Sequence, residues 1–251
     1  MKKVLSFILS LSILMCSSVI AYANDAHCNE REYESAVAEI MKTYYDDKDS
    51  ALAALEELDT VLLEEPTIVE HASSNGILNT YATKPTDYTL KVYSFRRAGS
   101  LYYHLQWLLT ANKKEYAPGP LDYVSLEWDS NRASYYLSNG DSKVSTVQAK
   151  KSGIVLFNVQ DSDLKKGESA YGTVQVKPTK KNTSIEYGSK FVHTYTKLLV
   201  SGSASYSFAS SISLNAKGDA SLGISNNYGF TVNVGSKTNK WQIWADNAVK
   251  V

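Results

Sequence analysis

The sequence predicts a mainly β chain of the α+β class, in which a small N-terminal helical hairpin precedes an antiparallel β-sandwich and a C-terminal β-hairpin region. Three observations predict it. Residues 30–64 repeat apolar side chains every three or four positions, which is the helical period. Beyond residue 86, apolar and polar residues alternate in short runs separated by turn residues. Residues 201–236 are rich in Ser, Ala, Gly and Asn and keep one apolar face.

Residues 1–23 have the parts of a secretory signal peptide. Lys2 and Lys3 precede an apolar run from Val4 to Met15, and a small-residue cleavage signal ends at Ala23. The run is about a dozen residues, whereas a helix that crosses a bilayer needs roughly 20. We therefore expect cleavage after Ala23 and a secreted, extracellular chain. Lipidation of Cys16 is the weaker alternative.

Charge divides the remaining chain. Residues 30–65 contain twelve acidic and three basic residues, a net charge of −9, whereas residues 66–251 carry +8. This asymmetry indicates an interaction surface or an internal cover. Cys28 is the single cysteine after the expected cleavage, which excludes a disulfide within the mature chain.

The acidic segment, residues 24–66, is predicted to form two short amphipathic helices. The stripe of the first is Tyr33, Val37, Ile40, Met41 and Tyr44, and that of the second is Leu52, Leu55, Leu58 and Leu62. An acidic run around Asp47 separates the stripes, and Pro66 ends the second. Each helix has one apolar stripe, so both need a surface to pack on.

Residues 67–178 are predicted to form the sandwich. Period-two alternation is clearest at 101–109, where five large apolar side chains occupy every second position. Asn139-Gly140 is a strong two-residue turn signal. The layout of residues 86–178 resembles an immunoglobulin-type β-sandwich, although the paired core cysteines of antibody domains are absent. The resemblance implies two packed antiparallel sheets and nothing about function.

The region 179–251 contains the candidate binding site, a hairpin over residues 204–234 with one apolar face. That face consists of Tyr206, Phe208, Ile212, Leu214, Leu222, Ile224, Tyr228 and Phe230. Each arm is roughly as long as a tilted transmembrane β-strand, which needs about 9–11 residues. The hairpin resembles the inserting segments of aerolysin-type β-pore-forming toxins, which implies membrane insertion. The alternative is an edge hairpin of a soluble sandwich with its apolar side inward.

The search for chemistry finds no catalytic motif, so we expect no enzyme, no metal site and no cofactor. No G-x-S-x-G or H-E-x-x-H sequence occurs. His104 and His193 fall in strand-like runs and are interpreted as ordinary sheet residues. Asp47 and Asp161 begin short acidic runs that fail the calcium-loop pattern, so they are interpreted as loop or helix-capping acids.

The sequence therefore favours a secreted, non-enzymatic β-rich protein that binds a cell-surface, polymeric or protein partner. The basic β region suits an anionic cell-surface polymer, a protein or a membrane, and no nucleic-acid partner is expected. The alternative is a membrane-active, pore-forming toxin-like protein that uses the hairpin 204–234.

Overall fold

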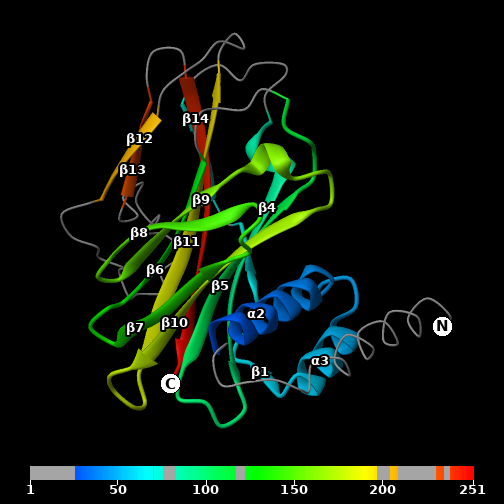
Figure 1. Ribbon diagram of the computed structural model, residues 1–251, viewed down its shortest axis with the longest axis vertical. Coiled ribbons are helices and arrows are strands. Elements are labelled where there is room, and N and C mark those ends of the chain that lie inside the picture. Colours follow the sequence, from blue (N-terminus) through cyan, green and yellow to red (C-terminus); the bar gives the residue numbers. More distant parts are fainter. Residues whose placement is uncertain are drawn as a thin grey trace, which may run out of the picture. The chain divides into compact units, whose positions relative to one another are not determined.

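The computed structural model places two antiparallel sheets in a β-sandwich (Figure 1). It describes residues 26–69, 71–75, 83–116, 122–196, 204–208, 230–234 and 238–251. The chain divides into two compact units, Met1–Tyr33 and Glu34–Val251, and both sheets belong to the second. Within the described residues, no helix is long and apolar enough to cross a membrane.

Each sheet has six strands. Sheet A has the order β1 (Thr60–Leu62), β4 (Tyr88–Arg97), β5 (Tyr103–Ala111), β10 (Ser169–Pro178) and β7 (Ala133–Gly140), with β2 (Thr67–Ile68) also paired to β4. Sheet B has the order β3 (His71–Asn75), β14 (Thr238–Lys250), β11 (Ser184–Thr196), β6 (Asp122–Trp128), β9 (Ile154–Val159) and β8 (Ser145–Lys151). A separate ribbon pairs β12 (Ala204–Phe208) with β13 (Phe230–Val234).

One core fills the space between the sheets. Side chains on alternate positions point inward from both sheets, among them Leu105 and Trp107 of β5 and Phe191 of β11. Gly172 of β10 is needed for this packing, because a Cβ there would lie 2.5 Å from Nε1 of Trp107. The alternation seen in the sequence therefore corresponds to burial between two sheets, which confirms the predicted mainly β, immunoglobulin-like sandwich with N-terminal helices.

Helix α2 (Ala26–Lys42) covers the outer face of sheet A from Glu34 onward (Figure 1). Val37 and Met41 have no exposed surface. Lys91 of β4 donates to the carbonyl oxygen of Met41 at 3.1 Å. The Glu34 carboxylate accepts from Asn139 at 3.0 Å and from Gln175 at 3.2 Å. The apolar stripe predicted for this helix is therefore its buried face, and buried polar side chains of sheet A hold its carboxylate.

Helix α3 (Lys48–Glu57) is shorter than the second predicted stripe. Asp47 caps it by accepting from the Ser50 N–H at 3.1 Å, which confirms the interpretation of Asp47 as a capping acid. The helix ends before Asp59, whose φ of 52° lies in the left-handed region. Leu52 is 39% exposed, and Leu62 belongs to β1 instead of the helix. The stripe therefore overestimated the helix, because leucine spacing alone cannot place its end.

Strands from both predicted β regions share sheet B. β11 and β14, from the region 179–251, pair along thirteen positions. β11 also pairs with β6 from the region 67–178. The boundary at residue 178 stays a prediction about domain organisation, whereas the hydrogen bonding is continuous across it.

Candidate functional site

The structure describes part of the predicted hairpin site. Tyr206, Phe208 and Phe230 lie on β12 and β13, where Phe208 pairs with Phe230 across the ribbon. The other five members, Ile212, Leu214, Leu222, Ile224 and Tyr228, lie outside the described residues.

The described base of the ribbon rests on the outer face of sheet B. Phe230 has no exposed surface and packs with Tyr123, Leu156 and Val192. The rings of Tyr206 and Tyr123 meet edge to face, with centroids 5.3 Å apart. The apolar side of the ribbon therefore points inward at its base.

Lys190 of β11 also holds Phe230 against sheet B. Its ammonium donates to the Phe230 carbonyl oxygen at 2.7 Å and lies 4.3 Å from the centre of the Phe230 ring. Burial lowers the pKa of Lys190 to about 8, although the Glu127 carboxylate opposes this shift. The ammonium that contacts the ribbon therefore loses its proton more readily than that of an exposed lysine.

A second candidate surface is a pair of stacked tyrosines on sheet A. The rings of Tyr102 and Tyr136 stack with centroids 4.1 Å apart. Tyr136 is 55% exposed, and Leu101, beside Tyr102, is 68% exposed. Lys177 of β10 is also exposed and pairs with Ser134 of β7, two residues before Tyr136. Together, Leu101, Tyr102, Tyr136 and Lys177 form what we call the tyrosine platform.

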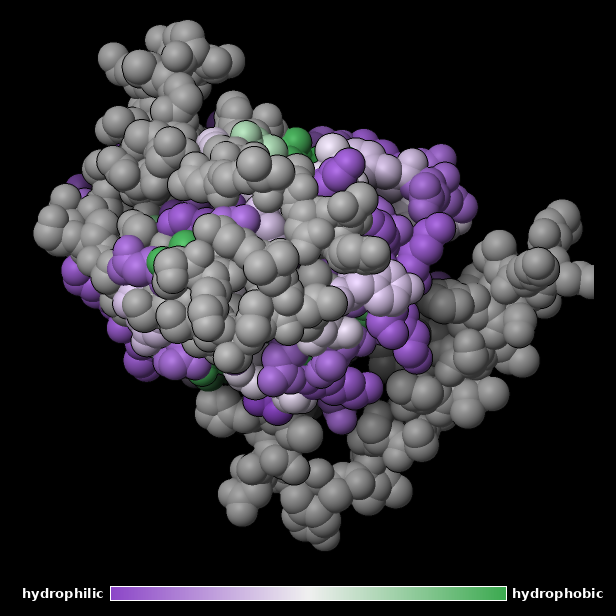
Figure 2. Space-filling model, turned by 90° about the horizontal axis from the view of Figure 1, so that it is seen from above, coloured by the Kyte–Doolittle hydropathy of each residue, from purple (hydrophilic) through white to green (hydrophobic). Residues whose placement is uncertain are grey.

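Other hydrophobic side chains are also exposed outside the platform. Seen from above, the described residues are mostly hydrophilic, and hydrophobic atoms form small spots (Figure 2). Among the other exposed aromatic side chains, Tyr116 has no ring partner in the contacts described, and Tyr45 meets Tyr44 edge to face and not in a stack. The tyrosine platform therefore differs from a random exposed ring by its stacking.

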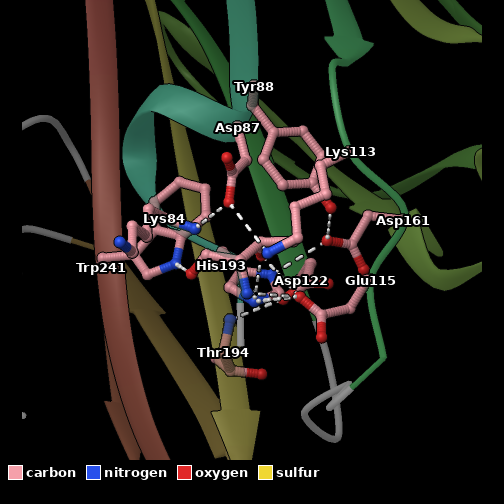
Figure 3. Close-up of polar contacts among 11 residues, drawn as sticks. Lys84, Asp87, Tyr88, Lys113, Glu115, Asp122, Asp161, His193, Thr194 and Trp241 are labelled. Atoms are coloured by element: carbon pink, nitrogen blue, oxygen red, sulfur yellow. Dashed lines mark hydrogen bonds and ion pairs between the residues drawn. The ribbon is translucent and has the colours of Figure 1, made fainter. Parts of the chain in front are cut away.

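The third candidate is a histidine buried among carboxylates at one end of the sandwich (Figure 3). His193 is on β11, Asp122 begins β6, Asp161 begins the 3₁₀ turn η2 (Asp161–Asp163), and Glu115 follows β5. Nδ1 of His193 lies 2.9 Å from Oδ2 of Asp161 and 3.4 Å from Oδ1 of Asp122. Nε2 lies 3.3 Å from Oε2 of Glu115.

Strand alternation brings His193 into this position. Phe191, His193 and Tyr195 share the inward side of β11 and are all fully buried. The indole of Trp241, from β14, lies 4.7 Å from the His193 ring and donates to the Thr83 carbonyl oxygen at 2.9 Å. Aromatic rings therefore surround the imidazole, and its polar neighbours are the carboxylates and the Thr83 hydroxyl.

Hydrogen-bond donors hold each carboxylate. The Tyr88 hydroxyl donates to Asp161 at 2.7 Å, and the Thr194 N–H donates to Asp122 at 2.6 Å. The Thr83 hydroxyl donates to Glu115 at 2.5 Å. The three donors lie on β4, on β11 and in the segment before β4, so folding of the whole sandwich end is needed to assemble the cluster.

The protons in this cluster are shared unevenly. Burial alone would lower the pKa of His193, but the carboxylates of Asp122 and Asp161 outweigh it and raise the pKa well above its usual value. Burial and the Asp161 charge raise the pKa of Asp122 well above its usual value. The pKa of Asp161 is lowered despite burial, because the positive charge of the imidazolium and the hydrogen bond from Tyr88 favour its charged form. Asp161 is therefore the ionised partner of His193.

The cluster has the order of a catalytic triad without access to a substrate. Thr83 Oγ1 lies 3.3 Å from Nε2 of His193, and Asp161 faces the other ring nitrogen. However, the Thr83 hydroxyl donates to Glu115, and Thr83 and His193 have no exposed surface. A nucleophile must reach its substrate, so this arrangement is not suited to catalysis as folded.

Sequence reasoning missed this cluster. Asp122, Asp161 and His193 come from distant parts of the chain, so no short spacing marks them. Asp161 was interpreted as a loop or capping acid, whereas the structure buries it against the histidine. One signal was present: His193 shares the parity of Phe191 and Tyr195, and a buried imidazole needs polar partners.

Comparison with known proteins adds little. No protein-family model matches this chain, and no curated protein sequence matches it significantly. Among solved structures, the sixth cohesin of scaffoldin B from Acetivibrio cellulolyticus aligns with a TM-score of 0.29 and 8% identity, over 36% of this chain and 74% of the cohesin. The seventh ScaB type I cohesin from Pseudobacteroides cellulosolvens gives a TM-score of 0.29 and 9% identity, over 37% of this chain and 69% of its own.

A structure of Fap1 fimbriae, which serve Streptococcus parasanguinis adhesion, aligns over 71% of this chain and 94% of its own, with a TM-score of 0.25 and 10% identity. Likeness at this level carries no argument about function.

Proposed function

We propose that this chain is an exported, non-enzymatic β-sandwich protein that binds an anionic cell-surface polymer through the tyrosine platform. The observation that carries the proposal is the stacking of Tyr102 on Tyr136 with more than half of the Tyr136 side chain exposed. Burying either tyrosine ring in the protein interior would stabilise the folded chain. An aromatic pair that is ordered but exposed therefore suits a binding surface.

The chemistry of the platform fits a polymer of charged sugars. Aromatic faces offer apolar contact to the flat side of a sugar ring, and tyrosine hydroxyls offer hydrogen bonds. Lys177 adds a positive charge on β10 beside the strand that carries Tyr136. The net charge of +8 over residues 66–251 favours local contact of the β region with an anionic polymer, with a strength that falls as salt is added.

We also propose that the chain has no catalytic activity. The triad-like group around Thr83 is buried, and the sequence contains neither a nucleophile elbow nor a zinc-protease motif. Export rests on the signal-peptide pattern of residues 1–23. An exported β protein with an ordered exposed aromatic pair and a basic body is best explained as a binding protein.

Retention of the purified chain on an immobilised anionic polysaccharide tests this function. We expect retention at low salt and release as salt is raised, because screening weakens the charge contribution. Changing both tyrosines, Tyr102→Ala with Tyr136→Ala, is expected to lower affinity roughly tenfold, which corresponds to about 1.4 kcal/mol. Tyr116→Ala removes a ring that is 64% exposed outside the platform and should leave retention unchanged.

Two results would contradict the proposal. One is a failure of the wild-type chain to be retained even at low salt. The other is equal retention of the wild type and the double tyrosine variant, since binding would then occur elsewhere.

Membrane activity is the second candidate, and one observation favours it. In the described residues, β12 and β13 pair with each other and belong to neither sheet of the sandwich. The described contacts of their base with sheet B are apolar side-chain packing and the hydrogen bond from the Lys190 ammonium to the Phe230 carbonyl oxygen. Insertion into a membrane would require the ribbon to leave the sandwich. Such a ribbon can leave without breaking the backbone hydrogen bonds of either sheet. Dye release from liposomes distinguishes this candidate from the first.

A further inference from the structure

The buried histidine cluster contains more negative than positive charge. Asp122, Asp161 and Glu115 are each at most 5% exposed, and His193 is fully buried. With all three carboxylates ionised, the cluster has a formal charge of −3 beside a neutral imidazole and −2 beside a protonated one. Burying several carboxylates together is strongly unfavourable unless protons or cations offset their charge.

The imidazole is oriented as it would be to bind a cation. Nε2 faces the Glu115 carboxylate at 3.3 Å, which favours a proton on that nitrogen. Nδ1 then presents its lone pair to Asp122 and Asp161. Although Nδ1 lies 2.9 Å from an Asp161 oxygen, the two are not aligned for a hydrogen bond, and this buried nitrogen has no hydrogen-bond partner. A carboxylate that holds the far nitrogen of a histidine is the usual second layer of a metal site.

The spacing of the donor atoms also fits a metal ion. One ligand atom from each of Asp122, Asp161 and His193 lies within 4.8 Å of the other two. Around a tetrahedral ion with bonds of about 2.0–2.1 Å, neighbouring ligand atoms are roughly 3.3 Å apart. The two distances from Nδ1, 2.9 Å and 3.4 Å, bracket that value. The Tyr88 hydroxyl and the Thr194 N–H orient the two carboxylates from outside.

We propose that Asp122, Asp161 and His193 bind one divalent transition-metal ion, with Glu115 as the residue that orients the imidazole. One nitrogen and two carboxylate oxygens suit Zn²⁺ or Mn²⁺ better than Ca²⁺, which prefers six to eight oxygen ligands. The site is structural, because it joins β6, η2 and β11 and is closed to substrate. This inference does not depend on the tyrosine platform.

Protons are the competing occupants of the site. A metal ion must displace these protons, because it binds neutral imidazole and ionised carboxylates. Metal affinity is therefore expected to fall as the pH is lowered, and binding should release protons to the buffer.

Calorimetric titration of the chelator-treated full chain with ZnCl₂ and with MnCl₂ tests the site. We expect one ion per chain for at least one of the two metals, a rise in the unfolding temperature, and proton release shown by different heats in two buffers. Asp161→Asn and Asp122→Asn preserve side-chain shape but remove a charged ligand, and each should lower affinity at least tenfold. Glu127→Gln is the matched control, because Glu127 is a fully buried carboxylate on β6 outside the cluster.

The variants are not needed for a decision. Substituting Co²⁺ in the wild-type chain should give the visible absorption of a bound ion with nitrogen and oxygen ligands, which a folding defect in a variant cannot confuse. The proposal is overturned by a wild-type chain that binds neither Zn²⁺ nor Mn²⁺ at one site, or by Asn variants that bind with unchanged affinity.

Discussion

Lys190 is 2% exposed and its ammonium donates to the Phe230 carbonyl oxygen, so its charge bears directly on stability. Its pKa is about 8 in the folded chain against an ordinary value of 10.5. Because the unfolded state holds this proton more tightly, the charge opposes folding below pH 8, and the penalty disappears as the pH rises toward 10.5. We expect the free energy of unfolding to gain up to about 3 kcal/mol across this range from Lys190.

Urea unfolding of the wild type and of Lys190→Met between pH 7 and pH 10.5 measures this contribution. Methionine fills a similar space without a titrating group, so the difference between the two proteins isolates Lys190 from tyrosines that titrate in the same range. Lys177→Met, at an exposed position, should keep the wild-type pH dependence. An identical alkaline gain in Lys190→Met would show that this ammonium is not the cause.

Residue roles could be predicted where the cause is local. Asp47 was interpreted as a capping acid from its position before a helical stripe, and it caps α3. Asp161 has the same local appearance, but its partner His193 is 32 positions away in the chain and reaches it through the fold. Local sequence can therefore predict the cap, whereas the buried pair needs a strand pairing that no local pattern encodes.

Helices and strands show the same contrast between features with a local cause and features that depend on distant residues. The stripe of α2 was predicted because helical period persists over several turns, and its apolar members are the buried ones. β1 has three residues, which is too short for alternation to separate it from the preceding leucine spacing. The ribbon was predicted as a hairpin with one apolar face, but its docking on sheet B depends on Tyr123 and Val192, which the hairpin sequence does not contain.

Liposome leakage tests whether the ribbon of β12 and β13 acts on membranes. The proposed binding function predicts no dye release by the wild-type chain. Phe230→Asp should lower the free energy of unfolding by several kcal/mol, because it removes a fully buried ring and buries a charge. Asn233→Asp places the same charge at an exposed site on β13 and should have little effect. Leakage by the wild type that Phe230→Asp abolishes and Asn233→Asp retains would instead support the membrane-active candidate.

For the whole molecule, alternation predicted the two-layer architecture but not which strands are neighbours. β14 lies between β3 and β11, two strands more than a hundred positions apart in the chain. Such neighbours are chosen by the fit of complete sheet faces around Trp107 and Phe191, and that fit exists only after both sheets have formed. The candidate metal site inherits this dependence, since its residues meet only at the finished end of the sandwich.

Because one core joins both sheets, neither sheet should survive the loss of the other. We expect residues 34–251 to unfold in a single transition, followed together by far-ultraviolet circular dichroism and tryptophan fluorescence. Leu105→Ala in sheet A and Phe191→Ala in sheet B should each lower the free energy of that same transition by about 2–5 kcal/mol. Leu52→Ala, at a position 39% exposed on α3, should change it by less than the core substitutions. Two separate transitions, with Leu105→Ala moving only one of them, would mean that the sheets fold independently and that the shared core does not couple them.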